Sequence, residues 1–191
     1  RAKDTVVLGI PRGGMVVAGE IARLLAAKLD IALSRKLGAP GNPELAIGSI
    51  SESGRLFLND DLAFRVGADK KYIEAEKARQ LAEIKGRIRR FRGVKEKVPL
   101  KGKTVILTDD GVATGATMQA ALGDARQDNP ERLIAAIPVG AKDSLEALVE
   151  CADELIALRV PEYLGAIGQF YLNFEQTSDE EVLEILREKD I

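Results

Sequence analysis

Two consecutive aspartates, Asp109 and Asp110, stand where an α/β protein would place a ligand-binding site. An apolar stretch precedes them, and a loop with two glycines and two threonines, residues 111–117, leads into a helical pattern. Ligands of open α/β sheets bind at such strand ends. Glycines let backbone amides approach an anion, and the free amides at the start of a helix bind phosphate. The carboxylates would repel that phosphate, so we expect them to bind sugar hydroxyls or a hydrated divalent cation, as a sugar phosphate would require.

A second glycine-containing turn carries a positive charge. Arg12, Gly13 and Gly14 follow a strand-like run and precede a helical pattern. Backbone amides in such a turn form an anion-binding nest, and a guanidinium can add two hydrogen bonds to a phosphate. The alternative is a tight turn whose arginine points into solvent.

A third group of candidate residues is the pair Arg35 and Lys36. Residues 37–43, which follow the pair, are dense in Gly, Pro and Asn and therefore predict a loop. A loop that opens with two cations can close over an anionic leaving group and exclude water from a reactive intermediate. We therefore include both residues among the candidate catalytic residues.

Strand-like and helix-like segments alternate along the chain, which predicts a parallel sheet flanked by helices. The predicted strands are residues 5–10, 30–34, 104–109, 132–139 and 154–160, and the predicted helices between them are residues 15–28, 114–127 and 142–151. Residues 47–50 and 55–59 predict a β-hairpin inserted between the second and third of these strands. Ser178 and Glu181 have the spacing of a capping box, which predicts a helix over residues 178–190.

A long basic helix is predicted over residues 69–91. Residues 69–97 contain eleven basic and five acidic side chains, whereas the whole chain has a net charge of −2. Such a run could form a patch for nucleic acid or polyphosphate, but it contains few aromatic residues for base stacking. We interpret it as a solvated helix face and expect no nucleic-acid partner.

The composition excludes several kinds of chemistry. The chain has 191 residues, no histidine and a single cysteine, Cys151. Imidazole acid–base catalysis, a Ser-His-Asp triad, histidine-ligated zinc and an intrachain disulfide are therefore impossible. No apolar stretch approaches the roughly 18 residues of a membrane span, so we expect no membrane partner and a cytoplasmic location.

Residues 105–117 resemble the motif with which type I phosphoribosyltransferases bind 5-phosphoribosyl-1-pyrophosphate (PRPP). The resemblance implies that Asp109 and Asp110 hold the ribose hydroxyls. It assigns the 5-phosphate to Gly111, Val112, Ala113, Thr114, Gly115, Ala116 and Thr117. In the same family the turn after the first strand binds pyrophosphate, which falls here on Arg12, Gly13 and Gly14, and the pair Arg35 and Lys36 resembles the start of the mobile catalytic loop.

The similarity extends over nearly the whole chain, to a branch of uncharacterised phosphoribosyltransferases. It implies one domain over residues 1–191, with the type I fold, a hairpin insertion and a C-terminal hood at about residues 160–177. Members of this branch begin with a further short helical segment, so we expect an N-terminal element to be missing. A homodimer is compatible with the resemblance.

The implied reaction is transfer of the phosphoribosyl group of PRPP to a nitrogenous base with release of pyrophosphate, with Mg²⁺ carried on PRPP. Ala113 stands where 6-oxopurine enzymes have an aspartate, which makes hypoxanthine and guanine less favoured. The aromatic residues Tyr163, Phe170, Tyr171 and Phe174 can cover a base or belong to the core. A regulatory module that senses PRPP or a nucleotide, and a hydrolase or phosphorylase acting on the same ligands, remain as alternatives.

Overall fold

The computed structural model describes residues 4–187, apart from the side chain of Glu44. Its centre is a five-stranded sheet in the order β2-β1-β6-β7-β8, with all neighbouring strands parallel. The strands are β1 (Thr5–Gly9), β2 (Lys28–Ile31), β6 (Thr104–Thr108), β7 (Arg132–Val139) and β8 (Glu154–Arg159). The five predicted strands therefore exist, and the predicted parallel sheet is confirmed.

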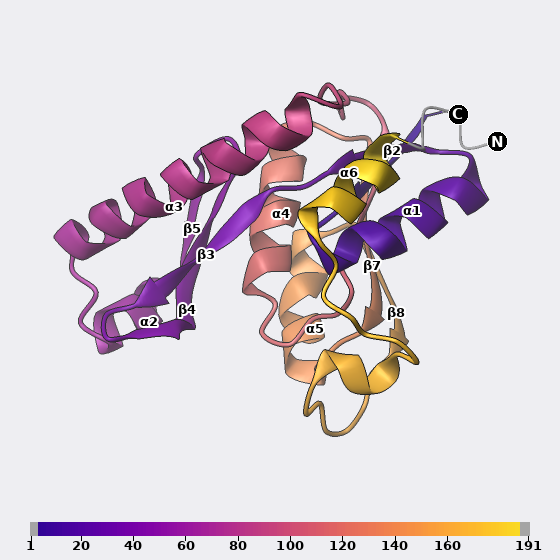
Figure 1. Cartoon of the computed structure of the whole chain (residues 1–191). Helices are drawn as coiled ribbons and strands as arrows, with labels where there is room; N and C mark the ends of the chain where they lie inside the picture. Colours follow the sequence, from indigo (N-terminus) through magenta and orange to yellow (C-terminus); the bar gives the residue numbers. More distant parts are fainter. Residues whose placement is uncertain (1–3, 188–191) are drawn as a thin grey trace.

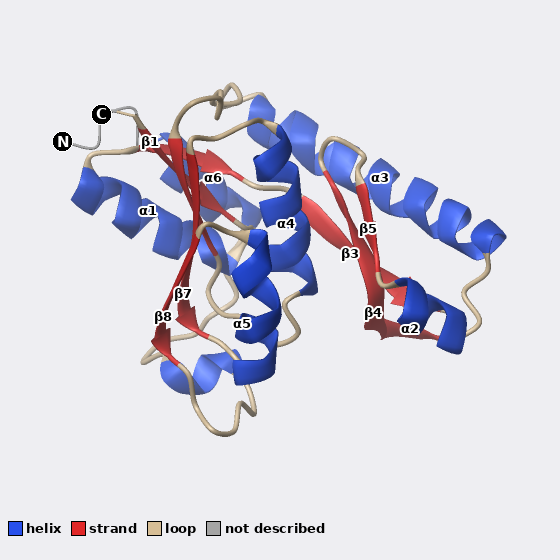
Figure 2. Ribbon diagram, turned by 180° about the vertical axis from the view of Figure 1, so that it is seen from behind, coloured by secondary structure: helices blue, strands red, loops and turns tan. Residues whose placement is uncertain are grey.

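Helices cover both faces of this sheet (Figures 1 and 2). On one face lie α1 (Gly13–Leu25) and α6 (Asp179–Arg187); on the other lie α4 (Ala116–Gln127), α5 (Lys142–Leu148) and the short 3-10 helix η1 (Val149–Cys151). Strand residues such as Val105 and Leu107 pack with Leu122 of α4, while Val7 packs with Met15 of α1. Alternate side chains of β1 and β6 thus enter two different apolar layers, as the pleat of a sheet requires.

A second, antiparallel sheet lies to one side of the first and is formed by β3 (Ser34–Ala39), β4 (Asn42–Ser51) and β5 (Leu56–Leu58). The predicted hairpin is confirmed, because β4 pairs with β5. The prediction of a loop over residues 37–43 is wrong. Pro40 and Gly41 form a two-residue turn between β3 and β4, with Gly41 at φ 73°, a conformation that suits glycine. The Gly, Pro and Asn residues mark a turn between paired strands.

The predicted strand at residues 30–34 also needs correction. It ends at Ile31 in the parallel sheet, and the chain enters the antiparallel sheet at Ser34. One apolar run thus supplies residues to two sheets. Its side chains Ile31 and Leu33, together with Leu37 of β3, all enter the same hydrophobic cluster.

Two helices, α2 (Asp60–Arg65) and α3 (Lys70–Arg92), follow β5. The predicted basic helix is confirmed as α3, which begins after Asp69; that side chain accepts a hydrogen bond of 2.7 Å from the amide of Tyr72. Helix α2 was not predicted, although Asn59 caps it by accepting a 3.0 Å hydrogen bond from the amide of Leu62. An Asn before two aspartates favours a helix start, and the sequence analysis did not include this signal.

The capping box predicted at the last helix is confirmed. The backbone amide of Ser178 donates to Glu181 at 2.6 Å, and the amide of Glu181 donates to the Ser178 hydroxyl at 3.1 Å. Helix α6 then runs to Arg187, and the predicted residues 188–190 lie outside the described part of the chain. Within residues 4–187, none of the helices combines the length and apolar character that crossing a bilayer requires.

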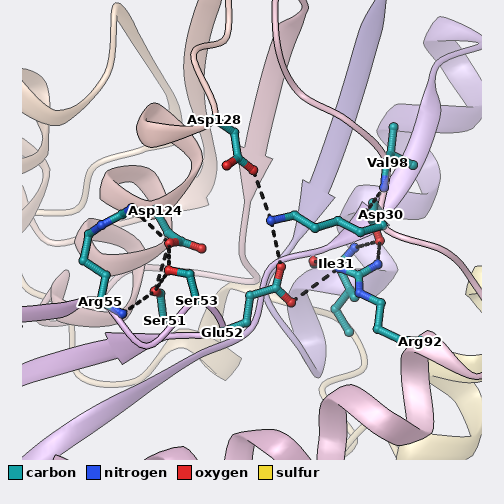
Figure 3. A network of polar contacts seen from close by, with 11 residues as sticks. Asp30, Ile31, Ser51, Glu52, Ser53, Arg55, Arg92, Val98, Asp124 and Asp128 are labelled. Carbon is teal, nitrogen blue, oxygen red and sulfur yellow. Dashed lines mark hydrogen bonds and ion pairs between the residues drawn. The ribbon is translucent and has the colours of Figure 1, made fainter.

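A buried ionic network joins α3 to both sheets (Figure 3). Asp30, which is 1% exposed, forms an ion pair with Arg92 and accepts hydrogen bonds of 2.8 Å from the amides of Ile31 and Val98. Arg92 also approaches Glu52, at the end of β4, at 3.4 Å. The end of α3 is therefore fixed relative to the parallel sheet and to the inserted sheet together.

A second set of polar contacts lies on the other side of Glu52. Lys97 bridges Glu52 at 3.3 Å and Asp128, just after α4, at 3.1 Å. Asp124 of α4 accepts hydrogen bonds from Ser51 at 2.9 Å and from Arg55 at 3.0 Å (Figure 3). Through these contacts the inserted sheet is attached to α4 as well as to β2.

We expect Arg92→Ala to lower the free energy of unfolding by about 3–5 kcal/mol, because it leaves Asp30 buried without its cation. Denaturant titration followed by circular dichroism measures this loss. Arg89→Ala removes an exposed arginine from the same helix and should change stability by no more than about 0.5 kcal/mol. Equal losses in the two variants would show that the ion pair does not anchor α3.

Candidate functional site

The turn after β1 and the loop after β6 meet at one edge of the parallel sheet. These neighbouring strands pair Gly9 with Thr108, so the residues that follow them leave the sheet side by side. A Cβ atom at position 13 would lie 1.9 Å from Oδ2 of Asp110, and one at position 14 would lie 2.7 Å from Cα of Asp109. At position 14 the neighbouring atom is backbone, so only glycine fits there, whereas at position 13 the side chain of Asp110 would have to move. The two glycine-containing motifs found in the sequence are therefore packed directly against each other.

The two carboxylates differ in their surroundings. Asp109 is the more deeply buried, and its Oδ1 accepts a 2.8 Å hydrogen bond from the backbone amide of Asp110. Burial, and next the negative charge of Asp110, raise the pKa of Asp109 well above its ordinary value. Burial also raises the pKa of Asp110. A ligand that donates hydrogen bonds or brings positive charge would relieve this electrostatic cost.

The loop over residues 111–117 forms a shallow cavity of about 200 Å³ at the start of α4. Gly115, at φ 81°, is the residue immediately before the helix, in a backbone conformation that suits glycine. Val112 is buried and exchanges backbone hydrogen bonds of 2.9 Å with Val139 and Ala141, so the β7 end holds the loop in place. The loop can therefore present amides and the hydroxyls of Thr114 and Thr117 to an anion.

Whereas the cavity at the start of α4 borders Asp109, a second cavity, of about 370 Å³, borders Asp110. Its walls are residues of the glycine turn and α1, Asp110 and the C-terminal segment 171–177. The hydroxyl of Tyr171 donates a hydrogen bond to the backbone carbonyl of Asp110, and its ring packs against that of Phe174 with centroids 5.1 Å apart. Burial and the nearby carboxylates raise the pKa of Tyr171 to about 12, so it remains a hydrogen-bond donor at neutral pH.

The four candidate aromatic residues separate into two groups. Tyr171 and Phe174 line this cavity, whereas Tyr163 and Phe170 do not. Tyr163 is 84% exposed, on the loop before the 3-10 helix η2 (Ile167–Phe170). The cavity thus has one aromatic pair on the side of the C-terminal segment and Arg12 on the other.

Arg35 and Lys36 lie in strand β3, not in an irregular loop. The guanidinium of Arg35 donates a 2.9 Å hydrogen bond to Gln80 of α3 and forms an ion pair with Glu83. Gln80 in turn donates to Glu76 at 2.8 Å, and both of these side chains are buried. Sequence reasoning missed this support, although Glu76, Gln80 and Glu83 recur on one face of a helix otherwise rich in cations.

The metal-binding capacity of the site rests on the aspartate pair. Among residues 4–187, no group of three or more His, Cys, Asp and Glu side chains is placed to hold a metal ion. Two adjacent carboxylates nevertheless fit Mg²⁺, which proteins commonly hold through one or two carboxylates together with substrate phosphates and water.

The model of the phosphoribosyl transferase domain matches residues 1–174. The chain belongs to the phosphoribosyl transferase domain family. It is 44% identical over 184 residues to two provisionally named phosphoribosyl transferases from two strains of Mycobacterium tuberculosis, a match that covers 96% of this chain and 42% of each relative. The chain therefore spans about two fifths of the length of these curated relatives.

Solved structures agree with this family assignment. The crystal structure of TT1426 from Thermus thermophilus is 47% identical, with a TM-score of 0.85 over 98% of this chain and 89% of that chain. The AQ2163 protein from Aquifex aeolicus, 17% identical with a TM-score of 0.51 over 88% of this chain and 60% of that chain, shares the fold alone. The predicted type I phosphoribosyltransferase fold, a parallel sheet flanked by helices with an inserted hairpin, is confirmed.

Because burial makes the ionised form of Asp109 unfavourable, we expect a neutral residue at this position to make the phosphoribosyl transferase domain more stable. Because folding raises the pKa of Asp109, this group favours the folded state most below its unfolded-state pKa of about 3.9. That contribution is lost as the pH rises through the folded-state pKa. We expect Asp109→Asn to melt at a higher temperature than the parent at pH 8, by about 2–4 °C for each kcal/mol recovered.

Calorimetric unfolding at pH 4, 6 and 8 tests this, and the advantage of Asp109→Asn should shrink toward pH 4. Glu131→Gln, which neutralises an exposed carboxylate at the other end of the sheet, serves as the control and should show no such trend. A lower melting temperature for Asp109→Asn at pH 8 would contradict the assigned cause.

Proposed function

We propose that this chain transfers the phosphoribosyl group of PRPP to a nitrogenous base and releases pyrophosphate. The observation that carries the proposal is the direct packing of the Arg12-Gly13-Gly14 turn on Asp109 and Asp110. A positively charged glycine turn, an acidic pair and a helix-start loop lie around one point, and a phosphorylated sugar diphosphate has groups that match each of them. Membership of the phosphoribosyl transferase domain family supports the same ligand.

Each part of PRPP has a place in this arrangement. The 5-phosphate fits the loop over residues 111–117, which lines a cavity at the start of α4 and can offer backbone amides and two threonine hydroxyls. Asp109 and Asp110 accept hydrogen bonds from the ribose hydroxyls, and their charge stabilises positive charge that develops on the sugar. The backbone amides of Gly13 and Gly14 and the guanidinium of Arg12 bind the pyrophosphate. The base then enters the cavity beside Tyr171 and Phe174.

The reaction breaks the bond between the anomeric carbon and the pyrophosphate oxygen and forms a bond between that carbon and a base nitrogen, whose proton passes to water. The protein stabilises the departing charge and positions the partners, which needs no imidazole. The donor set of Asp109 and Asp110 fits Mg²⁺, which when bound with PRPP would neutralise part of the phosphate charge. We place the C-terminal segment, residues 160–177, as the hood over the base.

The decisive experiment is calorimetric titration of the wild type and of the Asp109→Asn/Asp110→Asn double variant with PRPP, with and without Mg²⁺. We expect saturable binding to the wild type and its loss in the double variant. In a screen of nucleobases for pyrophosphate release, Asp110→Asn should turn over at least tenfold more slowly, which corresponds to about 1.4 kcal/mol. Glu131→Gln is the control for substitution of a carboxylate.

Three results would change the proposal. PRPP binding without pyrophosphate release from any base would favour a regulatory module. Release of free base from a nucleotide without added pyrophosphate would favour a hydrolase. Failure of the wild type to bind PRPP would mean that the site serves another phosphate ligand.

A further inference from the structure

The C-terminal segment packs directly on the peptide that joins Asp110 to Gly111. It lies at the carboxyl ends of the parallel strands, at the bottom of Figure 1. A Cβ atom at position 111 would lie 2.6 Å from Cδ1 and 2.7 Å from Cγ2 of Ile167, the first residue of η2. Four residues further on, the hydroxyl of Tyr171 donates its hydrogen bond to the carbonyl of Asp110. One short segment therefore contacts both residues that flank this peptide bond.

Packing within the segment holds Tyr171 in this position. Its backbone amide donates a 3.2 Å hydrogen bond to the carbonyl of Gly168 in η2. Phe174 folds back on the same glycine, where a Cβ atom would lie 2.8 Å from Cδ1 of the ring, and its ring packs on that of Tyr171. Tyr171 therefore lines the cavity that we assign to the base, while its hydroxyl is bound to the loop of the aspartates.

The peptide that Tyr171 holds also supports the carboxylate of Asp110. In a trans peptide the carbonyl and the amide point in opposite directions, so a bond to the Asp110 carbonyl also sets the direction of the Gly111 amide. Burial is the largest influence on the pKa of Asp110 and raises it, whereas hydrogen bonding, including that from the Gly111 amide, lowers it. The amide of Gly111 is thus directed at the carboxyl group of the preceding residue.

The next part of the phosphate loop is held by different contacts. The amide of Val112 donates to the carbonyl of Val139, and the amide of Ala141 donates to the carbonyl of Val112, both at 2.9 Å. These bonds attach the loop to the end of β7. Loss of the Tyr171 hydroxyl should therefore disturb the acidic pair and leave the phosphate-binding part of the loop in place.

We propose that Tyr171 is a positioning residue, whose hydroxyl fixes the peptide between Asp110 and Gly111 and thereby orients the Asp110 carboxylate toward the ribose hydroxyls of the substrate. It acts through Asp110 and makes no bond to the substrate itself. A binding group that is already held in one orientation loses less conformational freedom when the ligand arrives, so the ligand binds more tightly. The inference rests on the proposed function in identifying a ribose as the ligand of Asp110.

Ribose 5-phosphate, titrated calorimetrically into the full chain, tests this role. Tyr171→Phe removes the hydroxyl and keeps the ring that packs on Phe174. We expect it to weaken ribose 5-phosphate binding at least fivefold and to leave the binding of inorganic phosphate within twofold of wild type. A merely structural loss would weaken both ligands together.

Tyr72→Phe is the matched control, because it removes a hydroxyl that makes the same kind of bond, 2.8 Å long, to the carbonyl of Gly38 in β3. It should change neither affinity. Melting temperatures within about 4 °C of wild type would establish that both variants fold.

Turnover measurements separate the two roles of the C-terminal segment. Tyr171→Phe should raise the KM for PRPP at least fivefold and leave the KM for the base within twofold of wild type. Phe174→Leu removes the ring partner and keeps the hydroxyl of Tyr171, so it should raise the KM for the base and leave ribose 5-phosphate binding within threefold.

Four outcomes would overturn the inference: wild type that binds no ribose 5-phosphate, Tyr171→Phe that binds it as wild type does, an equal loss of inorganic phosphate binding, or an increase confined to the KM for the base. The proposed function fails separately. If Tyr171→Phe selectively loses ribose 5-phosphate affinity but no base yields turnover with the wild type, the positioning role stands and the transferase proposal does not. If the wild type turns over PRPP and Tyr171→Phe has an unchanged KM for PRPP, only the positioning role is rejected.

Discussion

The close approach of Gly13 and Gly14 to Asp109 and Asp110 is the constraint on which the geometry of this sheet edge depends. It arises because β1 and β6 are adjacent and parallel, so the two segments that follow them emerge at the same level. Larger residues in the turn would push Arg12 away from the acidic pair. The same close packing buries Asp109 and raises its pKa, so the compactness that assembles the site also makes it electrostatically costly.

The inserted sheet and α3 place Arg35 and Lys36 of β3 beside the glycine turn, in a cavity that also reaches Pro11 and Thr117. Two weak hydrogen bonds hold the inserted sheet against the start of α4: Ser34 and Ser49 donate at 3.3 Å to the carbonyls of Thr117 and Ala116. Ionic contacts at Asp30, Glu52 and Asp124 hold the same end of the inserted sheet, because Ser34 pairs with Ser51 and Glu52 follows directly. The insertion is therefore part of the frame of the site, because it is attached to β2, α4 and the loop itself.

The features that could be predicted from the sequence are those set by a few consecutive residues. An apolar run ending in Asp109 and Asp110 before glycines indicates a strand, a loop and a helix whatever surrounds it, and the Ser178 and Glu181 capping box depends on four consecutive residues. Pairing over longer distances was not accessible. The turn at Pro40 and Gly41 looked like a loop because nothing local shows that the flanking residues pair as β3 and β4.

The candidate site residues show the same difference between local and long-range signals. Those in glycine-rich turns were found because glycine next to charge is informative by itself. The buried pair Glu76 and Gln80, which supports Arg35, was hidden within a helix whose composition resembles a solvated surface, and only the packing of α3 on β3 distinguishes it. The contact of Tyr171 with Asp110 spans 61 residues and has no signature in either segment.

The raised pKa of Asp109 also affects how ligand binding is coupled to acidity. Over the pH range in which the aspartate pair still retains a proton, a ligand that needs both carboxylates ionised must displace that proton into solution. Its apparent affinity then rises with pH, and the observed binding heat includes the protonation enthalpy of the buffer. Titrations in two buffers of different ionisation enthalpy would count the protons released, and so would report on the state of the acidic pair without any catalytic turnover.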